Sequence, residues 1–473
     1  MTALLKIYND FSYLTGLPQE IDDKLYEKLA FRKEGYYHSS AYRQHLWDGF
    51  TRFYSKSGKF LTGLLPEVYA ALTYYGVNYQ TIDDRDITQF TQKTIDKDFL
   101  NKWIPKKEKK FKELYDYQVD LVNQAIKYKR GIIQAPTGSG KTNIIICLMH
   151  LLPPKTPILF LANRKLLVKQ TYDDLIQWGV PNVGRLNSDY HDPNLITCVN
   201  VQSIHHIQKL LPKFKAVIAD EIHMLSNKSG ISVFKKLTGA TVRIAVSATP
   251  FKSDKVQKYT VKGYFGPVFK TSVVEGGVLT VNYLQGEGNL SKSVCTFYPI
   301  IEPQLPYEIW QDAVDLGLAR NVFLHNIVNR LTKKLKGRTL ILVERIVHGD
   351  MLNSLISNSL WVRGKDNEES RQYVIDKLKY SKEDVVAIAT RQIFDTGVNL
   401  FVHNVINNTD VSAEHIIKQL TGRGLRPADD KEILQYFDFV YKINPYLEDH
   451  SNERIKVLKK EKHKVIVKDS IDF

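Results

Sequence analysis

Cysteine is scarce in this chain, which has 473 residues but only three cysteines, Cys147, Cys198 and Cys295. They lie far apart in the sequence, so they match neither a disulfide framework nor the paired spacing of a zinc site. Long apolar runs are also missing, since no stretch approaches the ~18 consecutive apolar residues that a membrane-spanning helix needs. We therefore expect a protein of the reducing cytoplasm with no membrane partner.

Positive charge, in contrast, is abundant. The 66 Lys and Arg residues outnumber the 51 Asp and Glu residues, which gives a formal net charge of +15. Such an imbalance in a folded chain favours a polyanionic partner such as nucleic acid. Two segments concentrate the charge, residues 102–112 and 456–468. For each segment two interpretations stay open: it contacts a polyanion, or it only solvates the surface.

A glycine-bearing motif gives the first indication of chemistry. Residues 135–142 read Ala-Pro-Thr-Gly-Ser-Gly-Lys-Thr and follow the apolar run 131–134. A strand, a tight turn and a helix start in this order are typical of a phosphate-binding loop, whose backbone N–H groups surround a phosphate. Lys141 is expected to reach the β- and γ-phosphates, and the Thr142 hydroxyl to hold Mg²⁺. The other nucleotide-binding residues predicted in this loop are Pro136, Thr137, Gly138, Ser139 and Gly140.

Short apolar runs alternate with helical patterns in two parts of the chain. This alternation is typical of parallel sheets covered by helices on both faces, so the sequence predicts an α/β protein with two such domains in tandem. Ligands of these sheets bind beyond the carboxyl ends of the strands. The predicted strands are 132–133, 157–161, 195–201, 216–219 and 242–246 in the first domain, and 339–343, 360–362, 385–389, 405–406 and 437–440 in the second.

Changes in composition suggest the domain boundaries. An aromatic-rich start indicates a separate small α+β domain, and a Gly-rich region near 251–300 is expected to carry the crossing between the two larger domains. A β-hairpin is predicted there at 281–294, with Tyr283 as a candidate strand-separating residue. The predicted domains are residues 1–90, 91–275 and 276–473.

Two acidic residues follow the buried run 216–219. An acid at this strand end, Asp220, would coordinate Mg²⁺, and its neighbour Glu221 would orient or deprotonate the attacking water. Ser247 and Thr249 follow another apolar run, where they either form a simple turn or hydrogen-bond these carboxylates and couple the nucleotide state to the second domain. His223 is either a loop histidine or a member of the same coupling group.

Residues 419–426 (Gln-Leu-Thr-Gly-Arg-Gly-Leu-Arg) form a second decisive pattern. Arg423 and Arg426 are three residues apart, so on a helix they project from one face. Two guanidinium groups facing a γ-phosphate would neutralise the charge that develops during phosphoryl transfer. The alternative is an Arg-rich surface helix, but Gly422 disfavours it because glycine is costly inside a helix without a packing reason.

The ordered motifs resemble those of the superfamily 2 helicases of the DExH kind. Within this superfamily, the chain looks most like the phage branch-migration helicases of the UvsW type. The resemblance covers roughly residues 110–440 and implies two RecA-like domains. The segments that carry it are 114–118 (Leu-Tyr-Asp-Tyr-Gln), 135–142, 220–223 (Asp-Glu-Ile-His), 247–249 (Ser-Ala-Thr) and 419–426.

The resemblance also implies roles for individual residues. Gln118 would read the adenine edge, Arg423 and Arg426 would act as arginine fingers, and Gln419 would belong to the same catalytic group. Tyr115 stands where these enzymes often carry Arg, which suggests stacking on the base. Gly397 and Asn399 belong to the segment implied to contact the ribose. These enzymes frequently have an acid where this chain has Asn399. The residues implied to grip the nucleic-acid backbone are Asn163, Arg164, Gln202, Ser203, Arg345 and Thr390.

The resemblance places a substrate-recognition module at residues 1–90. Aromatics there are interspersed with basic residues, and they either stack on nucleic acid or pack a small core. Together these features predict a monomeric, ATP- and Mg²⁺-dependent DNA helicase or translocase that acts on forked or branched duplex DNA. If the chain is phage-encoded, it would work in the host cytoplasm. An RNA helicase, a motor subunit of a nuclease assembly and a scaffold with an inactive nucleotide site are the alternatives.

Overall fold

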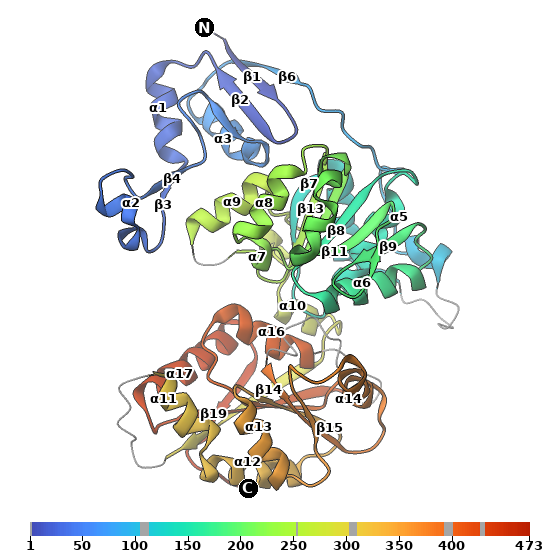
Figure 1. Cartoon of the computed structure of the whole chain (residues 1–473), viewed down its shortest axis with the longest axis vertical. Helices are drawn as coiled ribbons and strands as arrows, with labels where there is room; N and C mark the ends of the chain where they lie inside the picture. The colour runs from blue at the N-terminus through green and yellow to red at the C-terminus, as the bar shows by residue number, and fades with distance from the viewer. Residues whose placement is uncertain (1, 105–112, 252–253, 302–309, 392–400, 426–430) are drawn as a thin grey trace. The chain divides into compact units, whose positions relative to one another are not determined.

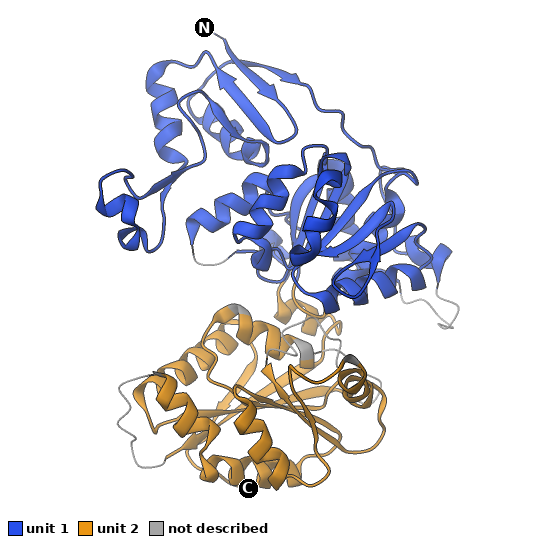
Figure 2. Ribbon diagram, in the orientation of Figure 1, with its two compact units in different colours: residues 1–135, 140–279 blue, residues 136–139, 280–473 orange. Residues whose placement is uncertain are grey.

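The computed structural model describes residues 2–104, 113–251, 254–301, 310–391, 401–425 and 431–473 (Figure 1). The chain divides into two compact units (Figure 2). The first consists of residues 1–135 and 140–279, and the second of residues 136–139 and 280–473. Among the described residues, no helix combines the length and the apolar character that crossing a bilayer requires.

The first unit begins with a small sheet whose strand order is β5-β2-β1-β6. Alternate residues of β1 and β2 are buried, and the buried face packs against helices α1 and α3 to form a core of its own. This is the small α+β domain that the sequence predicts. Its elements are β1 Ala3–Ile7, β2 Phe11–Thr15, α1 Gln19–Lys28, β3 Ala30–Arg32, α2 Ser40–Arg43, β4 Phe50–Arg52, β5 Lys59–Leu61, α3 Leu65–Tyr74 and β6 Tyr79–Asp83.

The rest of the first unit contains a seven-stranded sheet, ordered β10-β9-β11-β8-β12-β13-β7. All neighbouring strands pair in parallel except the short β10, which is antiparallel to β9. Its strands are β7 Arg130–Gln134, β8 Ile158–Ala162, β9 Val183–Leu186, β10 His191–Asp192, β11 Ile196–Asn200, β12 Ala216–Asp220 and β13 Val242–Ser247. Its helices are α4 Asp116–Tyr128, α5 Lys141–Leu151, α6 Lys165–Gln177, α7 Ile222–Leu225, α8 Lys228–Lys236 and α9 Lys255–Phe265.

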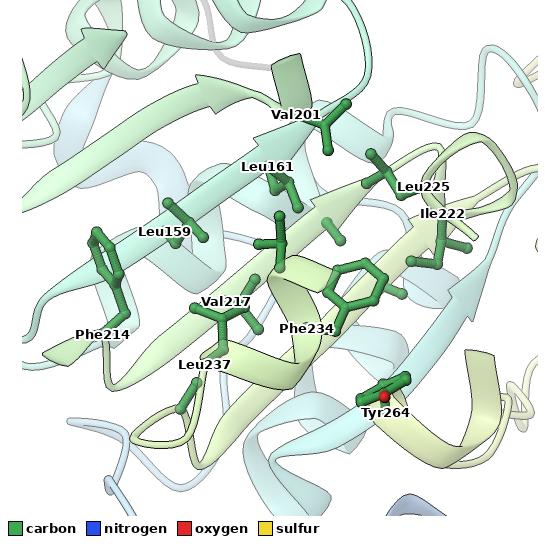
Figure 3. Close-up of a cluster of buried hydrophobic side chains, with 14 of the residues drawn as sticks. Leu159, Leu161, Val201, Phe214, Val217, Ile222, Leu225, Phe234, Leu237 and Tyr264 are labelled. Carbon is green, nitrogen blue, oxygen red and sulfur yellow. The ribbon is translucent and has the colours of Figure 1, made fainter. Parts of the chain in front are cut away.

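Helices on both faces bury the central strands of this sheet completely, which explains their continuous apolar runs. Figure 3 shows Val217 of strand β12, Phe234 of helix α8 and Leu237, which directly follows α8, in one cluster. Each of these three is at most 2% exposed. Burial of one such side chain stabilises the fold by about 1.5–3 kcal/mol. The core therefore fixes the position of the carboxyl end of β12, where Asp220 lies.

The second unit is built on another seven-stranded sheet, ordered β16-β17-β15-β18-β19-β14-β20, whose strands pair in parallel. The predicted pair of parallel-sheet domains is thus confirmed. The strands are β14 Lys292–Ile300, β15 Arg338–Val343, β16 Leu360–Val362, β17 Val385–Thr390, β18 Asn404–Asn408, β19 Ile433–Tyr441 and β20 Lys464–Val467. The helices are α10 Val281–Gly286, α11 Trp310–Val314, α12 Val322–Lys334, α13 Ile346–Leu355, α14 Glu368–Tyr380, α16 Glu414–Gly424 and α17 Pro445–Lys460.

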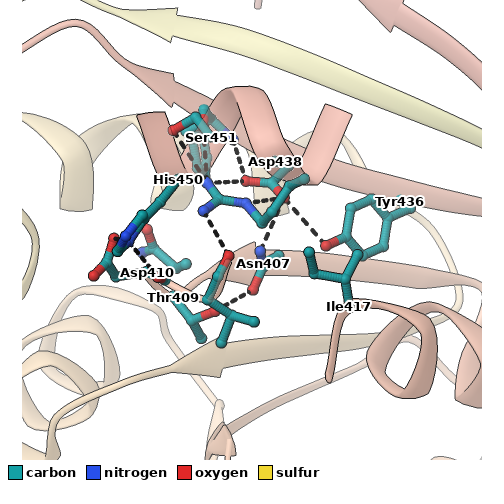
Figure 4. Close-up of polar contacts among 12 residues, drawn as sticks. Asn407, Thr409, Asp410, Ile417, Tyr436, Asp438, His450 and Ser451 are labelled. Atoms are coloured by element: carbon teal, nitrogen blue, oxygen red, sulfur yellow. Dashed lines mark hydrogen bonds and ion pairs between the residues drawn. The ribbon is translucent and has the colours of Figure 1, made fainter. Parts of the chain in front are cut away.

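A buried ion pair ties α17 to this sheet (Figure 4). Arg454 Nε lies 2.9 Å from Asp438 Oδ2, and both side chains are fully buried. The carboxylate also accepts hydrogen bonds from Asn407 Nδ2 at 2.9 Å and from the Tyr436 hydroxyl at 3.1 Å. Arg454 donates further to the carbonyl of Val411 at 3.1 Å. A buried pair is tolerated when neighbouring groups satisfy its remaining hydrogen-bonding capacity in this way.

The predicted hairpin at 281–294 is wrong. Residues 281–286 form helix α10, and residues 292–300 form β14, which pairs in parallel with β19 and β20 rather than with a hairpin partner. The Thr280 hydroxyl accepts a hydrogen bond from the Tyr283 N–H at 3.2 Å and so caps the helix. Val281 and Leu284 are buried three residues apart, which is helical spacing. Tyr283 therefore belongs to a helix and lies at no hairpin tip.

Candidate nucleotide site and backbone contacts

The predicted phosphate loop joins strand β7 to helix α5. Gly138 and Gly140 have φ angles of +86° and +73°, in the left-handed region that favours glycine. The Ser139 N–H and hydroxyl both donate to the carbonyl of Pro136, at 3.2 and 2.7 Å, and close a tight turn. The Ala135 N–H donates to Ser247 in the neighbouring strand β13 at 3.0 Å. The loop is therefore anchored to the carboxyl end of the sheet.

Glycine at position 140 also allows a close approach. A Cβ atom there would lie 2.3 Å from Gln118 Nε2. The buried Gln118 side chain accepts a hydrogen bond from the Tyr115 N–H at 3.0 Å and donates to the Gly140 carbonyl at 3.4 Å. The Tyr115 ring stacks on Tyr117, with ring centroids 5.5 Å apart. Gln118 and Tyr115, both predicted to contact the base, thus lie directly beside the phosphate loop.

Lys141 is the first residue of α5, and it meets an acid from the adjacent strand end. Its Nζ lies 3.8 Å from Glu221 Oε1 and 3.4 Å from the carbonyl of Ala135. The two charged side chains are only 14% and 16% exposed, so their attraction is screened less than that of a surface pair. Thr142 follows in the first turn of the same helix and is half-buried.

Asp220 and Glu221 mark the end of β12. Glu221 has a φ angle of +48°, a left-handed conformation that costs roughly 1–2 kcal/mol for a residue with a side chain. Its N–H donates to Asp220 Oδ1 at 2.9 Å. Burial, together with the adjacent Glu221 carboxylate, raises the pKa of Asp220 to about 7, although Lys141 opposes this shift. The sharp turn therefore brings two carboxylates close to one lysine.

The residues predicted to couple the site to the rest of the motor do contact one another. The Ser247 hydroxyl donates to Glu221 Oε2 at 3.0 Å, and His223 Nδ1 lies 3.1 Å from the same hydroxyl. The Thr249 N–H donates to Ser247 Oγ at 3.2 Å. His223 is buried in helix α7 and is 3.4 Å from Glu221 Oε2, so it is no loop histidine. Ser247 is thus the centre of a polar group formed around Glu221.

The oxygen-rich composition of this site fits a magnesium–nucleotide complex. The loop glycines open its backbone N–H groups for phosphate, and Lys141 supplies a cation. Mg²⁺ prefers oxygen ligands, and the Asp220 carboxylate and the Thr142 hydroxyl stand at the strand end and the helix start that flank the loop. The buried Asp220 carboxylate also carries an unfavourable charge that a bound cation would compensate.

The residues predicted to grip a nucleic-acid backbone in the first unit share one edge of the sheet. Asn163 and Arg164 follow β8, and Gln202 and Ser203 follow β11. The register pairs Asn200 with Ala162, so the two strands end side by side. Asn200 donates to Gln202 Oε1 at 2.8 Å. The four residues therefore begin the loops beyond two neighbouring carboxyl ends, where ligands of such sheets bind.

Comparison with known proteins agrees with this architecture. Residues 111–252 match the family "Type III restriction enzyme, res subunit". The chain is 22% identical over 463 residues to the ATP-dependent DNA helicase uvsW of Enterobacteria phage T4, covering 92% of this chain and 89% of that protein. It is 32% identical over 178 residues to the DNA 3'-5' translocase XPB2 of Sulfurisphaera tokodaii, 34% of this chain and 37% of that one. A fragment of a putative type I restriction HsdR subunit from Vibrio vulnificus shares its fold, with a TM-score of 0.51, 18% identity and coverage of 68% and 63%.

The similarity to the phage protein extends over 92% of this chain. The chain thus resembles the superfamily 2 helicases of the UvsW type over most of its length. Its predicted site residues in the second unit are only partly described. Gln419 is buried in helix α16, and Arg423 lies on the same helix, but its side chain is outside the described part. Gly397, Asn399 and Arg426 also lie outside the described residues, as do 105–112 of the first basic segment.

Two ion pairs at the second sheet of the helicase were missed by sequence reasoning. Arg391 directly follows the buried Thr390, and its guanidinium contacts both carboxylate oxygens of Glu344 at 3.1 Å. Arg345, at the start of α13, donates to Asp315 at 2.9 Å. The sequence could have indicated these pairs, because charged residues lie just after the predicted strands 339–343 and 385–389. In the second basic segment, Lys460 likewise pairs with Glu414 at 3.0 Å.

Proposed function

We propose that this helicase couples ATP hydrolysis to the remodelling of branched DNA, by fork regression and by branch migration of Holliday junctions in replication, recombination or repair. The observation that carries the ATPase half is the 3.8 Å approach of Lys141 to Glu221 beside a glycine-bearing phosphate loop. The branched substrate rests on the resemblance of the ordered motifs to phage branch-migration helicases. The chain acts as a monomer in this proposal.

The residues around the phosphate loop have separate roles in ATP hydrolysis. Backbone N–H groups of residues 137–140 surround the phosphates, and Lys141 balances their negative charge. Asp220 and Thr142 would hold Mg²⁺, which would supply electrostatic stabilisation of the phosphoryl group. Glu221 orients a water molecule and accepts its proton. Gln118 and Tyr115 position the base.

The hydrogen bonds around Ser247 support a coupling role for the end of β13. A change in the position or protonation of Glu221 alters its bond with Ser247, and through it the contacts of His223 and Thr249. Residues 247–249 lie at the carboxyl end of β13, which helix α9 of the same unit follows. We assign them the transmission of the nucleotide state.

Arg423 and Arg426, with Gln419 in the same segment, complete the catalytic set in this proposal. Guanidinium groups stabilise the charge that spreads over the transferred phosphoryl oxygens, and such a finger typically accelerates the reaction by roughly 10³–10⁵. Gly397 and Asn399 are assigned to the ribose. Asn163, Arg164, Gln202, Ser203, Arg345 and Thr390 grip the phosphodiester backbone, which fixes the position of the strand without reading its sequence.

A substrate panel tests this proposal. The wild-type protein is given forks, four-way junctions, blunt duplexes and RNA–DNA hybrids, and both ATP turnover and strand products are measured. We expect forks and four-way junctions to stimulate turnover most and to yield regressed or migrated products. Equal turnover on all four substrates, or stimulation mainly by the hybrids, would contradict the branched-DNA assignment.

A further inference from the structure

The N-terminal sheet leaves one of its faces uncovered by helices. Ala3, Leu5 and Ile7 of β1 point into the core with α1 and α3, so the intervening Leu4 and Lys6 point to the opposite face. In β2 the half-buried Phe11 and Tyr13 alternate with buried Ser12 and Leu14. The register places Lys6 opposite Tyr13. The open face of the N-terminal sheet therefore carries basic and aromatic side chains.

This face is hollowed and lined with rings and cations. A depression of about 760 Å³ is bordered by Lys6, Tyr8, Phe11 and Tyr13, and on one side by Thr238 of the first parallel-sheet domain. Tyr8, 40% exposed, meets Tyr13 edge to face with ring centroids 6.0 Å apart. Lys59 Nζ lies 4.0 Å from the centre of the Phe11 ring.

The turn that carries these rings is anchored to the first parallel-sheet domain. Arg243, 1% exposed, lies 2.6 Å from the Asp10 carboxylate. The buried Arg130 donates to the Asn9 carbonyl at 2.7 Å. Among the described residues that line the depression, Asp10 is the only one with a carboxylate, and Arg243 compensates its charge. Lys6, which also lines the depression, is positive, and so is Lys59 of the neighbouring strand β5.

We propose that this face, defined by Lys6, Tyr8, Phe11, Tyr13 and Lys59, binds a single strand of nucleic acid. Unpaired bases stack on the exposed rings, and the two lysines contact phosphates, a combination typical of sequence-independent single-strand binding. The cations complement a polyanion, and a duplex offers no free base faces to the rings. The proposal deepens the proposed function, on which it rests, by locating where an unwound strand is held.

Contacts between the N-terminal domain and the first parallel-sheet domain determine what a bound strand moves with. Besides Arg243, helix α9 contributes Tyr259, whose ring stacks on Phe31 at 4.1 Å, and Lys262, which pairs with Glu67 at 2.6 Å. These contacts join the N-terminal domain to the lobe that contains Lys141. A strand bound on the open face therefore moves together with that lobe.

Binding of a fluorescently labelled oligo(dT) to the full-length protein, without nucleotide, tests the proposal. Stacking of each base is worth a factor of roughly five to a hundred in affinity, so Tyr8→Ala with Tyr13→Ala should weaken binding at least about tenfold. Tyr8→Phe with Tyr13→Phe keeps the rings and should bind like wild type. Unchanged affinity in the double alanine variant would overturn the proposal.

A matched control lies on the same domain. Lys28 stands over the exposed Tyr74 at 5.7 Å, which repeats the lysine–ring arrangement outside the proposed site. Lys28→Ala with Tyr74→Ala should leave oligo(dT) affinity unchanged. An equal loss in this control and in the Tyr8 and Tyr13 variant would mean that any surface ring suffices, and it would contradict the specific site.

Photo-cross-linking to 5-iodouracil-substituted oligo(dT) locates the strand directly. We expect cross-linked peptides from residues 2–17 that disappear when unlabelled oligo(dT) competes but persist with blunt duplex. Cross-links confined to the two parallel-sheet domains, or competition by duplex alone, would overturn the proposal. ATP turnover without DNA should stay at the wild-type level in the Tyr8→Ala, Tyr13→Ala variant. The strand-binding proposal can therefore be contradicted without contradicting the proposed ATPase function.

Discussion

The two parallel-sheet domains each hold a polar network around an acid, and the two networks differ in exposure. In the first, Glu221 contacts Lys141, Ser247 and His223, and its side chain is 16% exposed. In the second, Asp438 contacts Arg454 and is fully buried. Network members that remain open to solvent can meet a substrate, whereas fully enclosed members can only support the fold. We therefore propose a chemical role for the first network and a structural role for the second.

The largest expected effect breaks the enclosed network. Arg454→Ala leaves the Asp438 carboxylate buried without its cation, which should lower the free energy of unfolding of the second unit by about 3–5 kcal/mol. Urea denaturation followed by circular dichroism measures the change. As a control, Lys456→Ala removes an exposed pair with Glu453 and should cost no more than about 1 kcal/mol. Equal stability of the two variants would contradict the structural role.

The next effect removes the cation of the open network. Lys141→Ala should lower DNA-stimulated ATP turnover by roughly a hundredfold or more, because the phosphates lose their charge-assisted contact. The unfolding free energy should change by less than about 1 kcal/mol, since the side chain packs at the edge of the core. Steady-state phosphate release and urea denaturation measure the two quantities. A stable variant with normal turnover would contradict the assignment.

The contrast between the networks was only partly predictable from sequence. The strands were readable because fully buried strands are continuously apolar, so 157–161 was predicted where Ile158–Ala162 forms β8. The hairpin failed because the cap provided by Thr280 and the buried pair Val281 and Leu284 make a short helix. Lys141 and Glu221 were assigned to one site from motif order, and their side chains lie 3.8 Å apart.

Long-range polar contacts left no local signal. Arg243 looks like an ordinary residue of an apolar strand, yet it lies buried against Asp10, 233 positions away. The burial of His223 and the pairing of Arg391 with Glu344 likewise depend on which strand ends become neighbours. Such partners are fixed by the topology of the sheet, which periodicity along the chain does not encode.

A smaller effect tests the coupling part of the open network. Ser247→Ala removes the hydroxyl that donates to Glu221 and should reduce DNA-stimulated turnover about tenfold, the effect of losing one hydrogen bond to a charged group. ATP binding should be retained, because the hydroxyl does not belong to the phosphate loop. ATP turnover with and without fork DNA measures the stimulation. Ser226→Ala serves as the control, because Ser226 directly follows helix α7. An identical loss in both variants would contradict specific coupling.

The smallest expected effect concerns acid stability of the second unit. Burial lowers the pKa of His325 to about 4, and the nearby His348 is also held well below its usual pKa by burial. The unfolded state therefore binds protons more readily below about pH 6.5, so stability is complete above that value and falls toward pH 4. Denaturation midpoints across this window should fall less in His325→Leu than in wild type. Parallel curves would contradict the assignment.

The role of Glu221 is the central claim, and branch migration by Glu221→Gln tests it most directly. The variant keeps the size and hydrogen-bonding capacity of the side chain but cannot accept a proton from water. We predict that it binds ATP and a four-way junction with affinities close to wild type, while junction migration and ATP turnover are both abolished. Migration of the junction at the wild-type rate would contradict the account.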